Sequence, residues 1–480
     1  MPRYYVVVAS GVLQVERIAL SAQGRRMHKY DVVILGTGCG LDIARKAAAK
    51  GKSVALVEPG ALGGTCINVG CIPSKMLIAP ADMVMEQERA RRLGVKVRVE
   101  SVDFPAIMRR MRRGRADSQH HLEHGVADIE GARLYTSPGV FVAPGILSVG
   151  GEEIGGELIF ITAGARPLVP PIAGLDTVPY LTNESLLELT KLPESLIIVG
   201  GGYIAVEFCH FFAAMGTRVT MLEMMDKLVT AEEPEFSATL KDVLSHRATI
   251  LTGVKVESVE AVTGGVRVTA RRGARGKARA FDAEHVLMAV GRRPNSDVLH
   301  VEAAGIATDA RGFIVVDSHM RTNVDGVYAA GDITGKAMFR HAANVQALVA
   351  SVNGLDGGDV EMDYRAIPHA VYTYPQIASV GLTEAQAREA GHEVTTLLTP
   401  YSSVAKGEAL DENDGFTKVV MKQGTDTILG FHIIGPYAPM LIQEVVNAMQ
   451  SGGHLDEIAR AIHIHPELTE LIPSSFEGLD

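Results

Sequence analysis

The sequence contains little cysteine, with four residues among 480. Domains that rely on disulfides for stability are much richer in cysteine, so a disulfide framework is excluded and a reducing compartment is expected. Long uncharged apolar runs are also lacking, and none reaches the ~18 positions of a membrane span. Basic charge is not in excess, because the formal net charge is −10, which argues against nucleic acid or an anionic membrane as the main partner. These absences predict a cytoplasmic globular protein of three or four domains.

The first 27 residues are harder to interpret. Residues 4–15 are mildly apolar, but Glu16 and Arg17 follow closely and no clear cleavage site is present, which disfavours a signal peptide. We interpret residues 1–27 as an optional N-terminal extension, or as the product of a start codon placed upstream of Met27.

Two of the cysteines lie five positions apart, at Cys66 and Cys71, within the run of residues 63–75. Structural zinc sites prefer a tighter cysteine pair with two further ligands, so a redox role fits better. On a regular helix residues five apart are roughly 8–9 Å apart at Cα, whereas a disulfide needs less than about 7 Å. If the two bond, the helical turn must be distorted, and Gly70 can absorb the distortion.

The chemistry of this run also favours a redox role. A helix N-terminus lowers the pKa of a thiol and makes a thiolate available for exchange. The alternative is that both cysteines are small buried apolar residues. That alternative would leave the flanking Gly-Gly-Thr and Pro-Ser-Lys segments without a role.

A dinucleotide-binding pattern begins at His28. Residues 30–35 are expected to form a buried strand, the turn Gly36-Thr37-Gly38 follows, and a helix is expected over residues 42–50. A second strand over residues 53–57 ends at Glu58, about twenty residues after the turn. In such a unit the glycines admit a pyrophosphate at the helix N-terminus, and the acid binds a ribose hydroxyl.

This first unit departs from the usual glycine pattern at one position. The third glycine would fall at Leu41. A leucine side chain there predicts that the helix and the strand pack less closely than usual.

The segment after the cysteines is polar and basic. Residues 109–115 are rich in arginine and are interpreted as a solvated helix face rather than an anion-binding patch. His120 and His124 are an i, i+4 pair next to His121, but no carboxylate or cysteine stands at a defined spacing, so no metal site is predicted. Strands are expected at residues 133–135 and 145–149.

The chain then repeats the first pattern. A strand over residues 195–199 leads into Gly200-Gly201-Gly202, an apolar helix over residues 203–215 and a strand over 218–222 that ends at Glu223. A strand and turn over residues 158–167 could return to the first sheet. The similar segment 286–294 would close the second unit in the same way.

The acid of the second unit bears on cofactor specificity. A carboxylate at Glu223 accepts a hydrogen bond from the 2′-hydroxyl of NAD but repels the 2′-phosphate of NADP. Ala205 in place of the third glycine is sometimes found with NADP. We give the charge more weight and predict NAD.

The run of residues 63–75 resembles the active-site motif of the flavin-dependent class I pyridine nucleotide-disulfide oxidoreductases, most of all their dihydrolipoyl dehydrogenase branch. The resemblance extends from about His28 to the C-terminus. Residues 322–332 are similar to the family's second flavin motif, whose aspartate, here Asp332, holds the ribityl chain. The resemblance implies an α/β fold with two Rossmann-like dinucleotide-binding domains and a C-terminal α+β dimerisation domain.

The resemblance also implies roles for individual residues. Cys71 would lie against the flavin, Cys66 would exchange with substrate, and Lys75 and Glu207 would pair beside the flavin. A glutamate in an apolar helix is costly without such a partner. The implied cofactor ligands are, for FAD, Gly36, Gly38, Glu58, Gly64, Thr65, Gly164 and Asp332 and, for NAD, Gly200, Gly202, Glu223 and Gly291.

The C-terminal segment would supply a proton carrier. The pKa of histidine suits thiol chemistry near neutrality, and a carboxylate can orient the ring. The family's histidine–glutamate pair corresponds to His465 and Glu470 rather than to His463, and the resemblance implies that they reach the cysteines of the other subunit of a homodimer. It also implies a cis bond before Pro466, and residues 371–375 are expected to form a strand of this region.

The predicted domains are an N-terminal extension, an FAD-binding domain with the redox cysteines, an NAD-binding domain, a return to the FAD domain, and a dimerisation domain, over residues 1–27, 28–170, 171–292, 293–362 and 363–480. The resemblance implies oxidation of dihydrolipoamide, either free or on a lipoyl-bearing protein, with NAD as acceptor. No cysteine follows Cys209, unlike in mercuric reductases. The alternatives are an NAD(P)H-dependent reductase of a low-molecular-weight disulfide such as mycothione, for which Leu41 and Gln376 leave room, and a flavin-binding redox sensor without turnover.

Overall fold

The structure is a computed structural model that describes residues 18–20 and 26–478. The extension predicted over residues 1–27 lies mostly outside the described residues and stays a prediction. Its described part includes a short strand, β1 (Ile18–Leu20), antiparallel to the start of β2 (Arg26–Leu35). The sequence placed the start of the first strand of the dinucleotide unit at Tyr30. In the structure this strand begins earlier, at Arg26.

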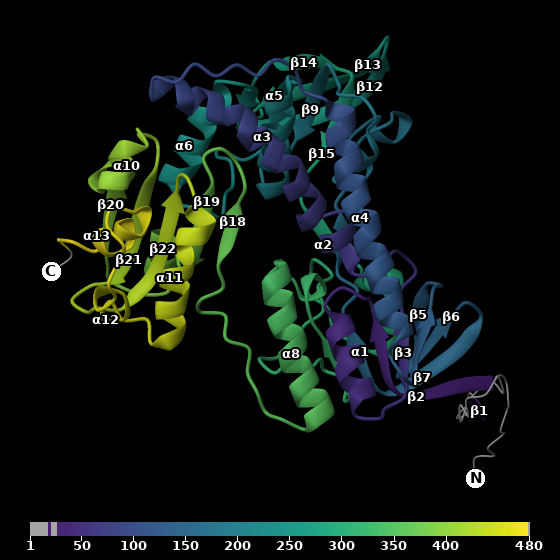
Figure 1. The fold of residues 1–480 in the computed structure, drawn as a ribbon. Coiled ribbons are helices and arrows are strands. Elements are labelled where there is room, and N and C mark those ends of the chain that lie inside the picture. Colours follow the sequence, from purple (N-terminus) through teal and green to yellow (C-terminus); the bar gives the residue numbers. More distant parts are fainter. Residues whose placement is uncertain (1–17, 21–25, 479–480) are drawn as a thin grey trace. The chain divides into compact units, whose positions relative to one another are not determined.

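The chain forms two compact units, and each is built from segments that are distant in the sequence (Figure 1). Unit 1 contains the chain up to Pro73 together with Arg112–Pro167 and Arg292–Asp363. Unit 2 contains Ser74–Met111, Leu168–Gly291 and Tyr364–Asp480. Two long helices belong to both, because α3 (Cys71–Arg92) begins in unit 1 and α4 (Phe104–Ala127) begins in unit 2.

Unit 1 is organised around an eight-stranded sheet with the order β4-β3-β2-β7-β6-β5, where β1 pairs with β2 and β17 with β7. Strands β2, β3, β4, β7 and β17 are mutually parallel, and β5 and β6 are antiparallel additions. The central strands are continuous apolar runs because both faces of a parallel sheet are covered. The strands after β2 are β3 (Val54–Val57), β4 (Ala132–Tyr135), β5 (Gly139–Ala143), β6 (Ile146–Val149), β7 (Glu152–Ile161) and β17 (Val327–Ala329).

The pairing of β7 with β2 confirms that the segment after residue 158 returns to the first sheet. Helix α1 packs beside α8, as Figure 1 shows. A two-stranded sheet joins β8 to β16. The remaining elements of unit 1 are α1 (Gly40–Ala49), α2 (Gly64–Asn68), β8 (Ala165–Pro167), β16 (Arg292–Pro294), α7 (Ser296–Leu299), α8 (Arg340–Asp356) and the 3₁₀ turns Val301–Ala304 and Asp332–Thr334.

Unit 2 contains a four-stranded parallel sheet, order β11-β10-β9-β15, and a three-stranded antiparallel sheet, β12-β13-β14. Apolar side chains of both sheets form one core, which includes Ile197, Val199, Val256 and Val268. The elements are β9 (Ser195–Val199), α5 (Tyr203–Met215), β10 (Arg218–Leu222), α6 (Pro234–Ser245), β11 (Thr249–Leu251), β12 (Val254–Val262), β13 (Gly265–Arg272), β14 (Ala278–Ala283), β15 (His285–Met288) and the 3₁₀ turns Leu175–Thr177 and Ser185–Glu188.

Unit 2 also contains a five-stranded antiparallel sheet, order β18-β19-β22-β21-β20, with α11 packed on it. Its elements are β18 (His369–Val371), β19 (Ile377–Gly381), α9 (Glu384–Glu389), β20 (Val394–Pro400), α10 (Ala405–Ala409), β21 (Phe416–Lys422), β22 (Ile428–Ile434), α11 (Ala438–Ser451), α12 (Asp456–Ala459), α13 (Leu471–Ser474) and the 3₁₀ turns Tyr401–Ser403 and Leu468–Glu470. The α/β architecture with two βαβ units and a C-terminal α+β region is the one that the sequence predicted.

One predicted strand is wrong at its C-terminal end. Strand β18 ends at Val371, whereas the sequence extended it to Pro375. The backbone N–H of Tyr372 donates to the carboxylate of Glu207 at 3.0 Å, and the hydroxyl of Thr373 donates to the carbonyl of Pro375 at 2.6 Å. These side-chain bonds replace the strand ladder.

Two further findings limit the function. Within residues 26–478 no helix combines the length and the apolar character that a bilayer span needs. Among the described residues, no group of three or more histidine, cysteine or carboxylate side chains is placed to hold a metal ion. The rings of His120 and His124 lie 4.4 Å apart, but this pair gains no third ligand.

Candidate active site

The two cysteines lie on consecutive helices separated by a break. Helix α2 ends at Asn68, and α3 begins at Cys71. A Cβ atom at Gly70 would lie 2.9 Å from the backbone oxygen of Thr65, so the break needs a glycine at this position. The side chain of Cys66 is hydrogen-bonded to Cys71. The structure thus confirms a distortion at Gly70 that brings the two thiols together.

The thiols differ in their electrostatics. The hydrogen bond with Cys71, burial and the charge of Cys71 raise the pKa of the Cys66 thiol. For Cys66 the predicted lowering of the pKa by a helix N-terminus is therefore wrong, because the neighbouring sulfur outweighs it. Cys71 is the first residue of α3, where a helix N-terminus favours a thiolate. Cys66 is half-buried and Cys71 is exposed, which excludes the alternative of two inert buried thiols.

The first glycine turn lies directly beside the cysteine segment. A Cβ at Gly64 would lie 3.0 Å from the Cα of Gly38, so the two backbones are in contact. The hydroxyl of Thr37 accepts from the backbone N–H of Gly63 at 2.9 Å and donates to the carboxylate of Glu58 at 2.8 Å. The backbone N–H of Thr37 donates to the same carboxylate at 3.0 Å. Unit 1 therefore places the turn, the acid and the cysteine pair in one region.

The packing expected at Leu41 is corrected by the structure. A Cβ at Gly40 would lie 2.4 Å from Oγ1 of Thr162 and 2.7 Å from Cγ2 of Ile34. Helix α1 therefore approaches the sheet closely, through a glycine one position before the expected one. The side chain of Leu41 is buried in the core.

Asp332 lies on a 3₁₀ turn of unit 1, close to Arg292. The Nε atom of Arg292 is 3.6 Å from Oδ2 of Asp332, and among the described residues this buried nitrogen has no hydrogen-bond partner. Burial raises the pKa of the Asp332 carboxyl, and the charge of Arg292 opposes the shift only in part. Buried polar groups are normally satisfied, so this pair fits a site that awaits a polar ligand.

Arg340, the first residue of α8, adds a positive charge to this region. Its Nη1 lies 3.7 Å from the position of a Cβ at Gly38, above the first glycine turn. Its charge acts to lower the pKa of the Cys66 and Cys39 thiols. No described residue offers Arg340 a hydrogen bond or an ion pair. A half-buried guanidinium over a glycine turn fits the pyrophosphate of a dinucleotide such as FAD.

Three further residues of the predicted FAD set also lie in unit 1. The hydroxyl of Thr65 accepts a hydrogen bond from Nη2 of Arg292 at 3.3 Å. Gly164 has a φ of +64°, and no atom lies within 4 Å of an added Cβ, so its backbone is open to a ligand. Gly36 has a φ of +98° and packs against the carbonyl of Thr162.

The second glycine turn is built in unit 2. Gly200 has a φ of +116° and packs against the backbone of Ala289, whereas an added Cβ at Gly202 would meet nothing within 4 Å. Gly201 lies under the acid, because its Cβ would be 2.9 Å from Oε2 of Glu223. The carboxylate of Glu223 also accepts from the backbone N–H of Met225. Gly291, with a φ of +127°, is open on its Cβ side.

Lys75 and Glu207 form an ion pair between α3 and α5. The Nζ atom of Lys75 is 2.8 Å from Oε2 and 3.0 Å from Oε1 of Glu207. The Glu207 side chain is 8% exposed, and that of Lys75 is 34% exposed. Tyr372 completes the group, with its backbone N–H on Glu207 and its ring centroid 4.5 Å from the lysine Nζ. The partner that the sequence required for Glu207 is present.

His465 and Glu470 are also brought together. Nδ1 of His465 is 2.9 Å from Oε1 and 3.1 Å from Oε2 of Glu470. The hydrogen bond with His465 lowers the pKa of the Glu470 carboxyl. His463 bonds to a different carboxylate, that of Glu444, at 2.7 Å. The peptide bond between His465 and Pro466 is cis, as the resemblance implied.

Sequence reasoning missed four residues of these sites: Thr37, Arg292, Arg340 and Tyr372. Thr37 carried a weak signal, since it lies between the two glycines of the first turn. The other three are far in the sequence from the motifs that they contact. No spacing rule connects them, and only the fold places them.

Comparison with known proteins identifies the family. Residues 30–347 match the model of the pyridine nucleotide-disulphide oxidoreductases, and residues 367–475 match the dimerisation domain of these proteins. A dihydrolipoyl dehydrogenase of Chlamydia muridarum is 33% identical over 454 residues, covering 92% of this chain and 95% of its own. A mycothione reductase of Mycobacterium tuberculosis is 34% identical over 473 residues, covering 94% and 100%.

A solved structure agrees with these sequence matches. The HOCl-induced flavoprotein disulfide reductase RclA of Escherichia coli superposes with a TM-score of 0.83 at 30% identity, covering 94% of this chain and 100% of its own. The chain is therefore an enzyme of the class I pyridine nucleotide-disulfide oxidoreductase family, which is FAD-dependent and uses NAD(P)H.

Proposed function

We propose that the protein oxidises dihydrolipoamide to lipoamide through a Cys66–Cys71 disulfide, with NAD as the final acceptor. The observation that carries the proposal is the contact between the two thiols beside the first glycine turn. A dithiol that closes to a disulfide beside a dinucleotide site can receive an electron pair from a substrate dithiol and pass it on.

The residues present fit FAD. Glu58, Arg340 and Asp332 would hold the ribose, the pyrophosphate and the ribityl chain, and Gly38 and Gly164 leave space for its close approach, with Gly64 packed against Gly38. When bound, FAD supplies the two-electron carrier between the cysteine pair and a nicotinamide.

The thiol exchange balances as follows. A substrate thiolate attacks the Cys66 sulfur of the Cys66–Cys71 disulfide, the S–S bond breaks and Cys71 leaves as a thiolate. The second substrate thiol loses its proton and attacks the substrate sulfur of the mixed disulfide. The substrate disulfide leaves, the pair of electrons stays on the two cysteines, and Cys66 takes a proton. The raised pKa of Cys66 and the helix N-terminus at Cys71 support this division of roles.

His465 is proposed as the proton carrier. A carboxylate on Nδ1 stabilises the tautomer with a free Nε2, which can then accept a proton from a thiol. The His465 side chain is 72% exposed in the single chain. The adjacent Ile462 and Ile464 are 100% and 73% exposed, which is unusual for isoleucine and supports a covering partner. We therefore propose that His465 reaches the cysteine pair of the other subunit of a homodimer.

Lys75 and Glu207 are proposed as the ion pair beside the flavin. Lys75 is four residues after Cys71 on α3, so both side chains lie on the same face of that helix. The buried carboxylate of Glu207 fixes the lysine head group in one position.

A second candidate is an NAD(P)H-dependent reductase of a small anionic disulfide. Two observations favour it. The match to mycothione reductase spans the full length of that relative, and Arg340 places near Cys66 a cation that pairs with no described residue. The carboxylate of Glu223 supports NAD over NADP in either case.

Steady-state assays with lipoamide, mycothione, glutathione disulfide and coenzyme A disulfide, each with NADH and NADPH, separate the two candidates. Dihydrolipoamide oxidation with NAD is expected to have the highest kcat/KM. A higher kcat/KM for mycothione would replace the first candidate with the second. Failure of NADH to reduce the flavin and the cysteines anaerobically would instead support the redox sensor without turnover.

The proton carrier is tested by His465→Gln, with His463→Gln as the matched control. Loss of a positioned acid–base group lowers kcat/KM by about 10²–10⁴-fold. The reduction of the enzyme by NADH, followed by stopped flow, should not change in His465→Gln. An equal loss in His463→Gln would contradict the assignment.

The cross-subunit arrangement is tested by mixing two inactive proteins, Cys66→Ser and His465→Gln. In a two-fold dimer each mixed pair regains one complete site, so random reassortment restores about a quarter of the normal activity. If the histidine serves its own subunit, no activity returns.

A further inference from the structure

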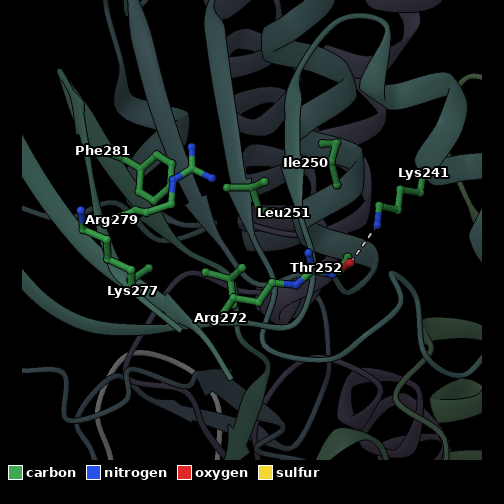
Figure 2. Close-up of a pocket in the computed structure, with 10 residues that line it drawn as sticks. Lys241, Ile250, Leu251, Thr252, Arg272, Lys277, Arg279 and Phe281 are labelled. Atoms are coloured by element: carbon green, nitrogen blue, oxygen red, sulfur yellow. Dashed lines mark hydrogen bonds between the residues drawn. The ribbon is translucent and has the colours of Figure 1, made fainter. Parts of the chain in front are cut away.

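Unit 2 contains a cavity that none of the sites above uses. It has a volume of about 130 Å³ and lies between helix α6, the edge strand β11 and the sheet β12-β13-β14. Figure 2 shows Lys241 on one side and the side chains from strands β13 and β14 on the other. Leu251, Val254 and Phe281 supply apolar wall.

The charged residues that line this cavity are all cations: Lys241, Arg272, Lys277 and Arg279. No carboxylate lines the cavity, although the chain has a net charge of −10. A concave surface lined by charges of one sign concentrates the potential and attracts counter-ions.

The strand register explains why two of the arginines face the cavity. Arg272 pairs with Val254 of β12, and Arg279 pairs with Ala270 of β13. Side chains alternate between the faces of a strand, so Arg272 and Arg279 point to the same face as the apolar core residues. The neighbouring Arg271 points to the opposite face, where it forms an ion pair with Glu257 at 2.7 Å.

The cavity cations keep their hydrogen-bonding capacity. Lys241 donates to the hydroxyl of Thr252 at 2.8 Å, and the guanidinium of Arg279 lies 5.4 Å from the ring centroid of Phe281. Arg272 and Lys277 form no hydrogen bond or ion pair with a described residue. Arginine and lysine head groups with free N–H donors are the usual ligands of a phosphate group.

The size of the cavity limits the ligand. Its volume corresponds to roughly four water molecules, at about 30 Å³ each. It is smaller than the ~300–1,000 Å³ of a pocket that encloses a whole organic ligand. It can hold one phosphate group but not a nucleotide.

The cavity is connected to the acid of the second dinucleotide unit. The backbone N–H of Glu223 donates to the carbonyl of Leu251 at 2.9 Å, and the N–H of Val254 donates to the carbonyl of Glu223 at 2.8 Å. The turn between them, at Gly253, has Oδ1 of Asp226 at 3.1 Å and Nε of Arg272 at 3.7 Å from its Cβ position. An anion bound by Arg272 would therefore lie close to the loop that follows Glu223.

We infer that this cavity binds a phosphate monoester dianion through Lys241, Arg272, Lys277 and Arg279. The phosphate belongs to a phosphorylated metabolite other than the pyridine nucleotide, because the carboxylate of Glu223 repels the 2′-phosphate of NADPH. The site lies outside the glycine turn and does not depend on which disulfide the enzyme uses.

The test uses calorimetric titration of the FAD-loaded protein with inorganic phosphate at low ionic strength. The double variant Arg272→Gln/Lys277→Gln is expected to bind phosphate at least about tenfold more weakly, since two charge-assisted contacts are lost. Arg275→Gln is the matched control, because Arg275 is on the same hairpin but does not line the cavity. It is expected to bind phosphate within about twofold of the unaltered protein.

Two further measurements separate this site from the pyridine nucleotide. Phosphate is expected to bind equally well in the presence of saturating NADPH, and 2′,5′-ADP is expected not to displace it. Displacement by 2′,5′-ADP, no binding to the unaltered protein, or an equal loss in Arg275→Gln would overturn the inference.

Discussion

Two carboxylates, one in each unit, have opposite surroundings. Glu232 of unit 2 is buried and accepts hydrogen bonds from Tyr203, His369 and Ser379, each at 2.7 Å. Burial alone would raise the pKa of Glu232, but these donors outweigh it and lower the pKa to about 2. Asp332 of unit 1 is half-buried, its carboxylate lies 3.6 Å from Arg292, and burial raises its pKa.

The difference separates a structural carboxylate from a functional one. Glu232 joins α5 of the parallel-sheet region to strands β18 and β19 of the antiparallel sheet, and its oxygens are fully used within the chain. Asp332 retains acceptor capacity that no described residue satisfies with a hydrogen bond. An incompletely satisfied group that is partly buried is expected where a ligand completes the site.

The largest expected effect is on the stability that Glu232 provides, because all its hydrogen bonds are made within the chain. Glu232→Gln replaces a charged acceptor of three donors with a neutral one and is expected to lower the free energy of unfolding by about 2–4 kcal/mol. Urea denaturation measures the change. Glu260→Gln is the control, because its side chain is 63% exposed, and should change stability by less than about 0.5 kcal/mol. A change that small in Glu232→Gln would remove the contrast.

Asp332 should show the reverse pattern, with little loss of stability but a loss of FAD affinity. Asp332→Asn removes a half-buried charge whose contact with Arg292 is long, so the FAD-free protein should keep or gain stability. The same variant should bind FAD on the order of tenfold more weakly, because a charge-assisted hydrogen bond is lost. Flavin fluorescence on dilution measures the release. Unchanged FAD affinity would show that Asp332 is not a ligand.

A third carboxylate, Glu223, sharpens the comparison because it is partly exposed. Glu223→Arg should weaken the use of NADH and improve that of NADPH by at least about tenfold in their ratio, or about 1.4 kcal/mol. The kcat/KM values for the two cofactors measure this. An unchanged ratio would show that the ribose lies elsewhere.

The smallest effect is on the pH dependence of stability. The lowered pKa of Glu232 contributes stability above its ordinary value of 4.5, and that stability is lost as the pH falls toward about 2. The raised pKa of Asp332 acts in the opposite sense, since stability is full below 3.8 and falls as the pH rises through the shifted value. Urea midpoints of the FAD-free variants between about pH 3 and pH 8 should show both slopes. If the contributions of Glu232 and Asp332 to stability changed with pH in the same direction, the assigned pKa shifts would be contradicted.

The sequence predicted local elements better than the contacts between them. The bounds of β9, α5 and β10 were correct to the residue, because three glycines and Gly216 mark the ends of the helix. The strand through Tyr372 failed because a side chain distant in the sequence, Glu207, takes its backbone N–H.

In the candidate site too, residues within local motifs were predicted better than residues brought in by distant contacts. Both cysteines, the lysine–glutamate pair and the histidine–glutamate pair were found from motifs, and the structure places the members of each pair together. Arg292 and Arg340 carried no local pattern. Their importance comes from the unsatisfied Nε of Arg292 and from the position of Arg340 over the first glycine turn, which only three-dimensional packing creates.

The contact between Gly38 and Gly64 has a consequence for the evolution and redesign of this chain. The two segments lie 26 positions apart in the sequence, and a Cβ at position 64 would lie 3.0 Å from the Cα of Gly38. The segment at Gly64 therefore cannot be exchanged for one that carries a side chain at this position unless the turn at Gly38 moves. A graft that alters one of them must carry the other with it.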